Sequence, residues 1–347
     1  MAAEDSVRRA FAIQAGHCAR LGSPFTASLC GLVAEWLDRR SAIGCRILDW
    51  PGPPEADALA LRLCGGLHAL VRRGRLPELA ILYPPAPLDP AALWDATARA
   101  LDEAGADLDP WLDGPPQTNE VARSGVLMPG LMAVAAATGE RPMILWEIGA
   151  SAGLNLVLDR YAYDLGGVAA GDPAAPVRLV PDWTGPPPPA ARVAVAARRG
   201  VDLNPLDLRE ASHRERLVAY IWPDQRERLA RMEAAIACAA ETPPPLDRGE
   251  ATAWLADRLA EPPQPGTVRV VQHSIALQYF PPAGQARVGA LLAEAGARAS
   301  PATPLAWLAY EFDGSACALT LTLWPGGERR ILASAHPHGQ WLRWSAA

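Results

Sequence analysis

The sequence predicts an α/β protein in which a doubly wound, mostly parallel sheet with an antiparallel edge follows an N-terminal helical region. Apolar residues recur at spacings of three, four or seven from residue 7 to about residue 104, which is the period of amphipathic helices. A short apolar run, residues 143–148, then stands between a proline and a glycine and is typical of a strand buried on both faces. Beyond it, apolar runs alternate with helical stretches, as in a sheet whose parallel strands are joined by helices.

These patterns place a domain boundary near residue 140. Residues 1–140 are expected to form the helical region and residues 141–347 the sheet domain, with an insertion at about 164–190 that is rich in proline and glycine. Two regions are also expected from length, because a single core rarely grows beyond about 250 to 300 residues and the chain has 347.

The individual elements follow from capping residues and breakers. Thr118 or Asn119 is expected to cap a segment that ends at Thr138. After the first strand, a helix is expected to run to about residue 161. Further strands are expected at 191–196, 267–272, 305–312, 318–324 and 329–333, further helices at about 212–240 and 282–295, and a hairpin at 325–327.

Composition excludes several classes of function. All 32 cationic residues are arginine, and without lysine neither a Walker phosphate loop nor a pyridoxal Schiff base can form. The net charge of −6 gives no electrostatic reason to expect a nucleic-acid or membrane partner. Six widely spaced cysteines with no Cys-x-x-Cys pair argue against a metal site and a disulfide scaffold, and the start of the sequence lacks the pattern of a secretory signal. A cytoplasmic protein that acts on a small molecule is therefore expected, with its oligomeric state left open.

The densest chemical signal is E-I-G-A-S-A-G-L-N-L, residues 147–156. Gly149 and Gly153 allow a sharp turn and a close approach to a ligand, while Ser151 and the amides of a following helix can donate hydrogen bonds. Such a turn at the end of a buried strand is suited to a polar ligand.

This motif resembles the first motif of class I S-adenosylmethionine-dependent methyltransferases, in which a strand-end acid and a glycine-rich turn cradle the methionine part of the cofactor. The resemblance implies a Rossmann-like sheet and S-adenosylmethionine as the cofactor. It also assigns cofactor-binding roles to Glu147, Gly149, Ser151 and Gly153.

Two later motifs extend the resemblance to the adenosine part of the cofactor. In R-G-V-D-L-N-P, Asp202 corresponds to the acid that binds the ribose hydroxyls and Leu203 to the apolar neighbour of adenine. In G-E-A-T-A-W-L, Glu250 corresponds to the acceptor for the adenine amino group and Ala251 to a backbone contact.

The apolar segment 268–280 resembles the fourth strand of these enzymes and the loop where cofactor and acceptor meet. His273 ends this strand and is the candidate base, with Ser274, Gln278 and Tyr279 as candidate acceptor contacts.

A second polar cluster, Gln117, Asn119 and Glu120, lies between two prolines and a buried segment. Its residues are expected either to cap the following helix or to contribute to the acceptor pocket.

At the level of the whole chain, the sequence is identified as a member of the domain of unknown function 2332 family. The motifs that carry this resemblance are P-P-Q-T-N-E, E-I-G-A-S-A-G-L-N, D-L-N-P-L-D, W-P-D-Q and W-P-G-G. The resemblance covers nearly the entire chain and implies no established activity.

The glycine turn also reads as G-x-S-x-G, the nucleophile elbow of α/β-hydrolases, with Ser151 as nucleophile. An acid and then a histidine follow in the required order, either Asp247 or Asp257 with His273, or Asp313 with His336 or His338. A helical region upstream disfavours this class, because hydrolases place several strands before the elbow.

A non-catalytic ligand-binding or partner-binding module is the third possibility, suggested by twelve tryptophans. The favoured hypothesis remains methyl transfer from S-adenosylmethionine to an unidentified small molecule. Two departures stand against close similarity to methyltransferases, namely the long insertion after the glycine turn and the lack of a helix after the fifth strand.

Overall fold

The computed structural model describes residues 2–312 and 316–345 and confirms the predicted α/β class, with helices first and a large sheet after them. The chain forms two compact units, which we call unit 1 and unit 2. Unit 1 comprises residues 1–118 and 211–233, and unit 2 comprises residues 119–210 and 234–347. Residues 119–140, which were expected in the helical region, belong to unit 2, and the chain returns to unit 1 after residue 210.

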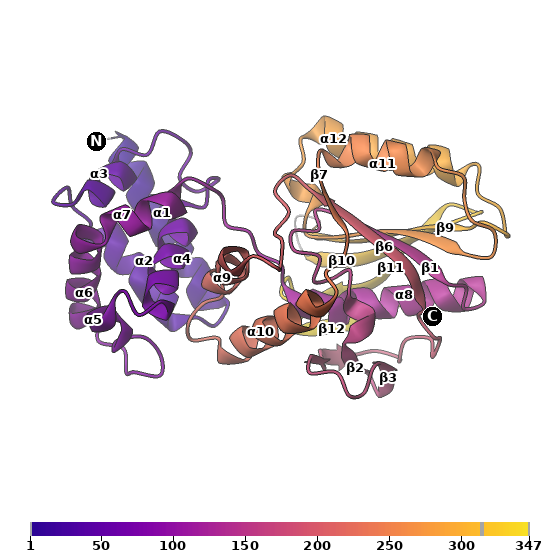
Figure 1. Cartoon of the computed structure of the whole chain (residues 1–347), viewed down its shortest axis with the longest axis horizontal. Coiled ribbons are helices and arrows are strands. Elements are labelled where there is room, and N and C mark those ends of the chain that lie inside the picture. Colours follow the sequence, from indigo (N-terminus) through magenta and orange to yellow (C-terminus); the bar gives the residue numbers. More distant parts are fainter. Residues whose placement is uncertain (1, 313–315, 346–347) are drawn as a thin grey trace. The chain divides into compact units, whose positions relative to one another are not determined.

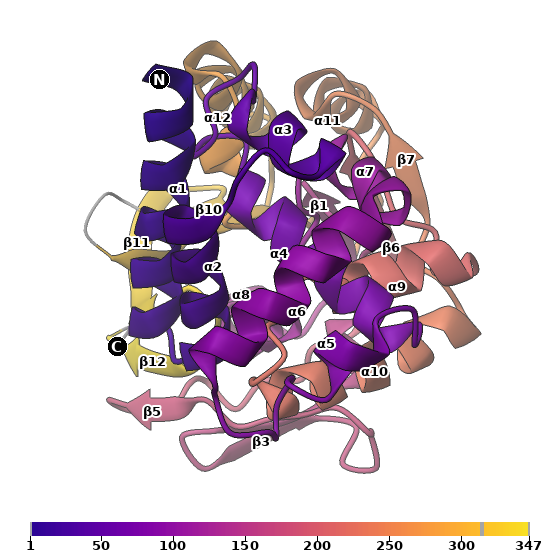
Figure 2. The same cartoon turned by 90° about the vertical axis from the view of Figure 1, so that its left-hand side faces the viewer.

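Unit 1 is helical, and Figure 2 shows α1 and α2 lying side by side. Its core is built mainly from leucine, isoleucine and phenylalanine side chains that recur on the inner faces of the helices between residues 2 and 112, as the spacing predicts. Its helices are α1 (Ala2–Arg20), α2 (Pro24–Trp36), α3 (Ala42–Leu48), α4 (Leu59–Arg72), α5 (Pro77–Ala80), α6 (Pro90–Glu103), α7 (Gly105–Leu112), α9 (Ala211–Ala219) and the first half of α10 (Arg226–Glu241).

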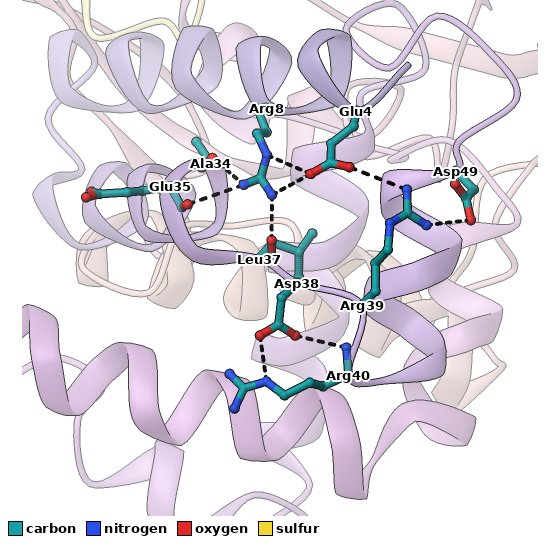
Figure 3. Close-up of polar contacts among 9 residues, drawn as sticks. All are labelled: Glu4, Arg8, Ala34, Glu35, Leu37, Asp38, Arg39, Arg40 and Asp49. Atoms are coloured by element: carbon teal, nitrogen blue, oxygen red, sulfur yellow. Dashed lines mark hydrogen bonds and ion pairs between the residues drawn. The ribbon is translucent and has the colours of Figure 1, made fainter. Parts of the chain in front are cut away.

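Arg8 on α1 caps the C-terminal end of α2 (Figure 3). Its guanidinium donates to the carbonyl oxygens of Ala34 and Leu37 and is held by Glu4, whose carboxylate lies 2.8 Å from Nη2. The carbonyls at a helix end have no partner within the helix, so a cation at this position stabilises it.

The W-P-D-Q segment lies in unit 1, between α9 and α10. The carboxylate of Asp224 accepts hydrogen bonds from the hydroxyl of Ser23 (2.6 Å) and the amide of Phe25 (2.9 Å) at the start of α2. The side-chain amide of Gln225 donates to the carbonyl of Leu21. A motif about two hundred residues downstream thus supplies the N-terminal cap of α2, which the helix's own Ser23 does not provide.

Unit 2 contains a nine-stranded sheet in the order β5-β12-β11-β10-β9-β8-β1-β6-β7. Strands β7, β6, β1, β8 and β9 are parallel, whereas β9, β10, β11 and β12 form antiparallel pairs. The strands are β1 (Met143–Ile148), β5 (Asp182–Thr184), β6 (Val195–Asp202), β7 (Leu246–Arg248), β8 (Val268–Ser274), β9 (Leu305–Phe312), β10 (Cys317–Trp324), β11 (Glu328–Ala335) and β12 (Trp341–Trp344).

Helices cover both faces of this sheet. Figure 1 shows α11 (Ala251–Ala260) and α12 (Pro282–Gly296) on one face and α8 (Ser124–Thr138) on the other. Side chains from β1, β6 and β8 form the core under α11 and α12. The segment Val121–Thr138 is long and apolar enough to cross a membrane, but 72% of it is buried inside the protein, as in a core helix.

The expected insertion builds additional strands. β2 (Ala162–Leu165), β3 (Val168–Gly171) and β4 (Arg178–Leu179) form a separate three-stranded sheet, and β5 pairs with β12 at the edge of the large sheet.

Two expected helices differ in the structure. The segment after β1 is a run of turns ending in a short 3-10 helix, η2 (Leu158–Arg160), so the prediction of an α-helix there was wrong. The amide of Leu154 donates to the side chain of Asn119, a hydrogen bond to another segment in place of an intrahelical one. The helix expected at 212–240 is two helices, α9 and α10, separated by the W-P-D-Q turn.

Candidate functional site

The candidate site lies where β1 ends between β6 and β8. From β1 the chain leads to β6 on one side, and after β7 it returns to β8 on the other side. In open α/β sheets such a reversal leaves a crevice at the carboxyl ends of the strands, which is where ligands bind. The segments that follow β1, β6 and β8 are those singled out from the sequence.

The glycine turn after β1 is tightly packed against its own chain. Gly149 and Gly153 have φ values of 69° and 73°, which favour glycine. A β-carbon at Gly149 would lie 2.6 Å from that of Ala276, and one at Gly153 would lie 2.6 Å from Cγ of Pro244. Both glycines are therefore required by internal packing, whether or not a ligand binds.

The amides of the turn are also engaged. Gly149 and Ala150 donate to the carbonyl of Val201, Ser151 donates to the carboxylate of Asp202, and Gly153 donates to Ala150. A methionine carboxylate would find few free amides here, so this end of the cofactor does not fit the turn in the expected way.

The end of β6 fits the adenosine part of the cofactor better. Asp202 is half-buried, and its Oδ2 and Oδ1 accept from the amides of Ser151 and Asn204, both at 2.9 Å. Each carboxylate oxygen has a second lone pair, so a diol could still donate to it. Leu203 beside it is 66% exposed, an unusual state for a leucine and one that an adenine ring would cover.

Glu250 and Ala251 follow β7, next to the end of β6. The amide of Gly249 donates to the carbonyl of Asp202. Glu250 is the N-cap of α11, and its carboxylate accepts from the amides of Thr252 and Ala253. Burial raises the pKa of Glu250, but a hydrogen bond from the hydroxyl of Thr252 together with the two amides outweighs burial and lowers the pKa below its usual value. The structure gives Glu250 a capping role and Ala251 a buried position at the start of the helix.

Glu147 lies within β1 and is buried. Burial raises the pKa of Glu147 to about 8, with the neighbouring charge of Asp202 adding to the effect and a hydrogen bond with Gln272 opposing it. Its Oε2 has no hydrogen-bond partner among the residues that the structure describes. Gln272, paired with Glu147 across the two strands, donates to the carbonyl of Asn155. This carboxyl group is therefore neutral near pH 7 and belongs to a buried polar network.

His273 is fully buried, and both of its ring nitrogens are occupied. Nδ1 lies 2.6 Å from Oε1 of Glu311, and Nε2 lies 2.9 Å from Nε1 of Trp307. The indole N–H can only donate, so Nε2 must be its acceptor and Nδ1 must carry the proton. The ring thus has no free lone pair with which to take a proton from a substrate, and this geometry places His273 in a structural role.

Glu311 organises the loop after β8. Its Oε1 accepts from His273 and from the amides of Ala276 and Leu277. Burial raises the pKa of Glu311, but the hydrogen bonds from His273 and from the two loop amides outweigh burial and lower it. The loop leads to the 3-10 helix η3 (Leu277–Tyr279), where Gln278 and Tyr279 are exposed, whereas Ser274 at the end of β8 is buried.

The polar cluster before α8 is divided between the two units. Gln117 belongs to unit 1, whereas Asn119 and Glu120 belong to unit 2 and are buried. Oδ1 of Asn119 accepts from the amide of Leu154 in the glycine turn, and Glu120 caps the 3-10 helix η1 (Val121–Arg123) through the amide of Ala122. Asn119 therefore supports the turn, and Glu120 has the capping role that was one of its two expected roles.

Arg123 is a site residue that the sequence reasoning missed. Its Nε donates to the carbonyl of Pro337 (2.9 Å) and its Nη1 to the carbonyl of Ser274 (3.0 Å). Burial lowers the pKa of Arg123, and the nearby carboxylates of Glu120 and Glu311 oppose this effect. The signal was available, because an arginine stands at the start of an otherwise apolar helical segment.

Ser151 has features of a nucleophile but lacks a base. Its φ is 52°, a strained value for serine, and its buried Oγ has no hydrogen-bond partner within residues 2–312 and 316–345. An α/β-hydrolase requires an imidazole next to this oxygen. His273 is engaged elsewhere, Nδ1 of His336 accepts from the amide of His338, and Asp313 lies outside the described residues.

Potential metal ligands do not gather in the described part of the chain, where no group of three or more His, Cys, Asp or Glu side chains could hold an ion. Four of the six cysteines are buried, and Sγ of Cys30 and of Cys64 lie 3.6 Å apart in the core of unit 1.

The parallel order β7-β6-β1-β8-β9, with helices on both faces and an acid at the end of β6, defines a Rossmann-like α/β protein. Its antiparallel continuation β10-β11-β12 follows β9 without an intervening helix. The chain belongs to the family described as an uncharacterized protein conserved in bacteria (DUF2332), which it matches over residues 8–344. No curated protein and no solved structure matches it.

Proposed function

We propose that unit 2 binds S-adenosylmethionine at the carboxyl ends of β1 and β6 and transfers its methyl group to a small molecule. The observation that carries the proposal is the pairing of Asp202 with the turn after β1, beside the exposed Leu203. Adjacent parallel strands bring an acid and an apolar platform together where a nucleoside would bind.

In this arrangement Asp202 would hold the ribose hydroxyls and Leu203 the adenine ring. The methionine part would meet Glu147 and Ser151, whose buried Oε2 and Oγ have no partners among the described residues. When bound, S-adenosylmethionine supplies an electrophilic methyl group. The protein's part is mainly to align the acceptor with it, and this requires no general base when the acceptor is already deprotonated.

Isothermal titration calorimetry with S-adenosylhomocysteine tests the proposal in the Asp202→Asn variant. Hydrogen bonds to a charged acceptor contribute about 1.5–3 kcal/mol, so we expect the affinity to fall roughly 10- to 100-fold. The asparagine keeps one side-chain oxygen and so preserves part of the contact with the turn.

Asp247→Asn is the matched control. Asp247 lies on the neighbouring strand β7, but its carboxylate is paired with Arg199 and accepts from the indole of Trp254. This substitution should leave affinity for S-adenosylhomocysteine unchanged. If the wild-type protein gives no binding heat, or if both variants lose affinity equally, the cofactor assignment is wrong.

A serine hydrolase is the second candidate, and the strained backbone of Ser151 is the observation that favours it. A fluorophosphonate that labelled Ser151 in the native protein would establish this alternative in place of methyl transfer.

A further inference from the structure

The strongest additional feature of the site is the cation at the carboxyl end of β8. Arg123 reaches this position from η1 and is fixed by two backbone carbonyls, those of Ser274 and Pro337. These bonds orient the planar guanidinium but leave its charge without a counterion in contact. Within the described residues, Arg123 forms no ion pair, and its hydrogen bonds come from Nε and Nη1 and not from Nη2.

A mostly buried cation without a contacting anion is costly, because buried charges are ordinarily paired. The nearby acids do not fill this role, since Oε1 of Glu311 is used by His273 and by the loop after β8, and Oε1 of Glu120 caps η1. Arg123 is anchored to Ser274 at the end of β8, and Tyr279, which is 77% exposed, follows in η3. A fixed cation and an accessible phenol are thus both held by the segment at the carboxyl end of β8.

We infer that Arg123 and Tyr279 bind the carboxylate group of a small-molecule ligand, with Nη2 of Arg123 and the phenol of Tyr279 as donors. The local charge favours a monoanion: Glu120 and Glu311 face the same cation, so a phosphate dianion would be repelled more strongly than a carboxylate. Carboxylate binding at Arg123 and Tyr279 does not depend on the proposed function. Only the further step, that this carboxylate ligand is the methyl acceptor, rests on the proposed function.

Saturation-transfer difference NMR of the full-length protein tests this site, with acetate and methylammonium as observed probes and inorganic phosphate, which has no carbon-bound protons, as a competitor of acetate. We expect acetate to bind weakly, roughly in the millimolar range. Methylammonium should give little signal, and phosphate should displace little acetate at the same ionic strength. Arg123→Gln should weaken acetate binding by roughly tenfold or more, because it removes a charge-assisted donor.

Arg269→Gln is the matched control. Arg269 is mostly buried and donates to the carbonyl of Glu261, so it resembles Arg123 in burial and in bonding to a backbone carbonyl. It differs from Arg123 in lying at the opposite end of β8. Acetate binding should be unchanged in this variant. Tyr279→Phe, at an exposed position, keeps the test decisive if Arg123→Gln fails to fold, and should weaken acetate binding severalfold.

Several results would overturn the inference. These are no acetate signal with the wild-type protein, equal binding by a folded Arg123→Gln variant, no effect of Tyr279→Phe, or a preference for phosphate. If S-adenosylhomocysteine displaces acetate, the carboxylate is the cofactor's own and the acceptor assignment is wrong. Acetate binding without S-adenosylhomocysteine binding would instead refute the proposed function and leave the carboxylate site standing.

Discussion

The ends of β6 and β8 look alike in sequence but differ in the structure. Each strand carries a polar side chain at or next to its last residue, Asp202 at the end of β6 and His273 one residue before the end of β8. Asp202 is half-buried next to an exposed leucine and keeps acceptor capacity, whereas His273 is enclosed with both nitrogens used. A polar residue at a strand end therefore indicates a binding site only when its hydrogen-bonding capacity remains free.

The largest effect that would test this difference is expected from His273→Asn. The substitution removes the hydrogen bond from Nδ1 to the mostly buried carboxylate of Glu311, and a hydrogen bond to a charged group contributes about 1.5–3 kcal/mol. Urea denaturation should show this loss in the free energy of unfolding, while the exposed His17→Asn should change little. If His273→Asn kept wild-type stability and lost only turnover, His273 would be a catalytic residue and the contrast between the two strand ends would fail.

A second prediction concerns Glu147, whose pKa is about 8 in the folded protein and near 4.5 when exposed. The folded state holds this proton more tightly, so the carboxyl group's contribution to stability falls as the pH rises from about 4.5 to 8. Glu147→Gln lacks this proton equilibrium. Its stability relative to wild type should therefore rise with pH, by roughly 1 kcal/mol per pH unit between pH 6 and 8.

Unfolding free energies of both proteins at pH 6, 7 and 8 would measure this difference, with the exposed Glu294→Gln as control. Parallel pH profiles for wild type and Glu147→Gln would show that Glu147 is ionised in the folded protein. The methionine end of the site would then carry one more negative charge than we infer.

The smallest effect is expected at Ser151. Because its Oγ is buried without a partner in the described structure, Ser151→Ala should alter stability by no more than about 1 kcal/mol. Ser151→Gly should stabilise slightly relative to alanine, since glycine tolerates a φ of 52°. Thermal melts would compare the two variants. A large loss of stability in Ser151→Ala would mean that the hydroxyl has a partner that this geometry does not show.

Much of the fold was predictable because burial and periodicity act locally. The run at 143–148 is β1, and the run at 305–312 is β9, with identical bounds. The missing α-helix after the glycine turn was not predictable, since it depends on a contact with Asn119, thirty-five residues away from Leu154.

The site was predictable only in part, for the same reason. Asp202 could be found from its motif, whereas the occupation of His273 depends on Trp307 and Glu311 from another strand. Glu311 did offer a signal, because it is the only charged residue in the apolar strand β9.

The cap that Asp224 provides for α2 has a consequence during synthesis. The segments that form α1 and α2 emerge from the ribosome long before Asp224 is translated. The first 118 residues therefore cannot complete the fold of unit 1 until about a hundred more have been synthesised. Throughout that interval the nascent helices expose apolar faces destined for the core, a state prone to aggregation and suited to chaperone binding. A gene fragment ending at residue 118 would reproduce this unfinished state permanently, whereas a fragment in which a short linker replaces residues 119–210 and the chain stops after residue 233 would encode every segment of unit 1.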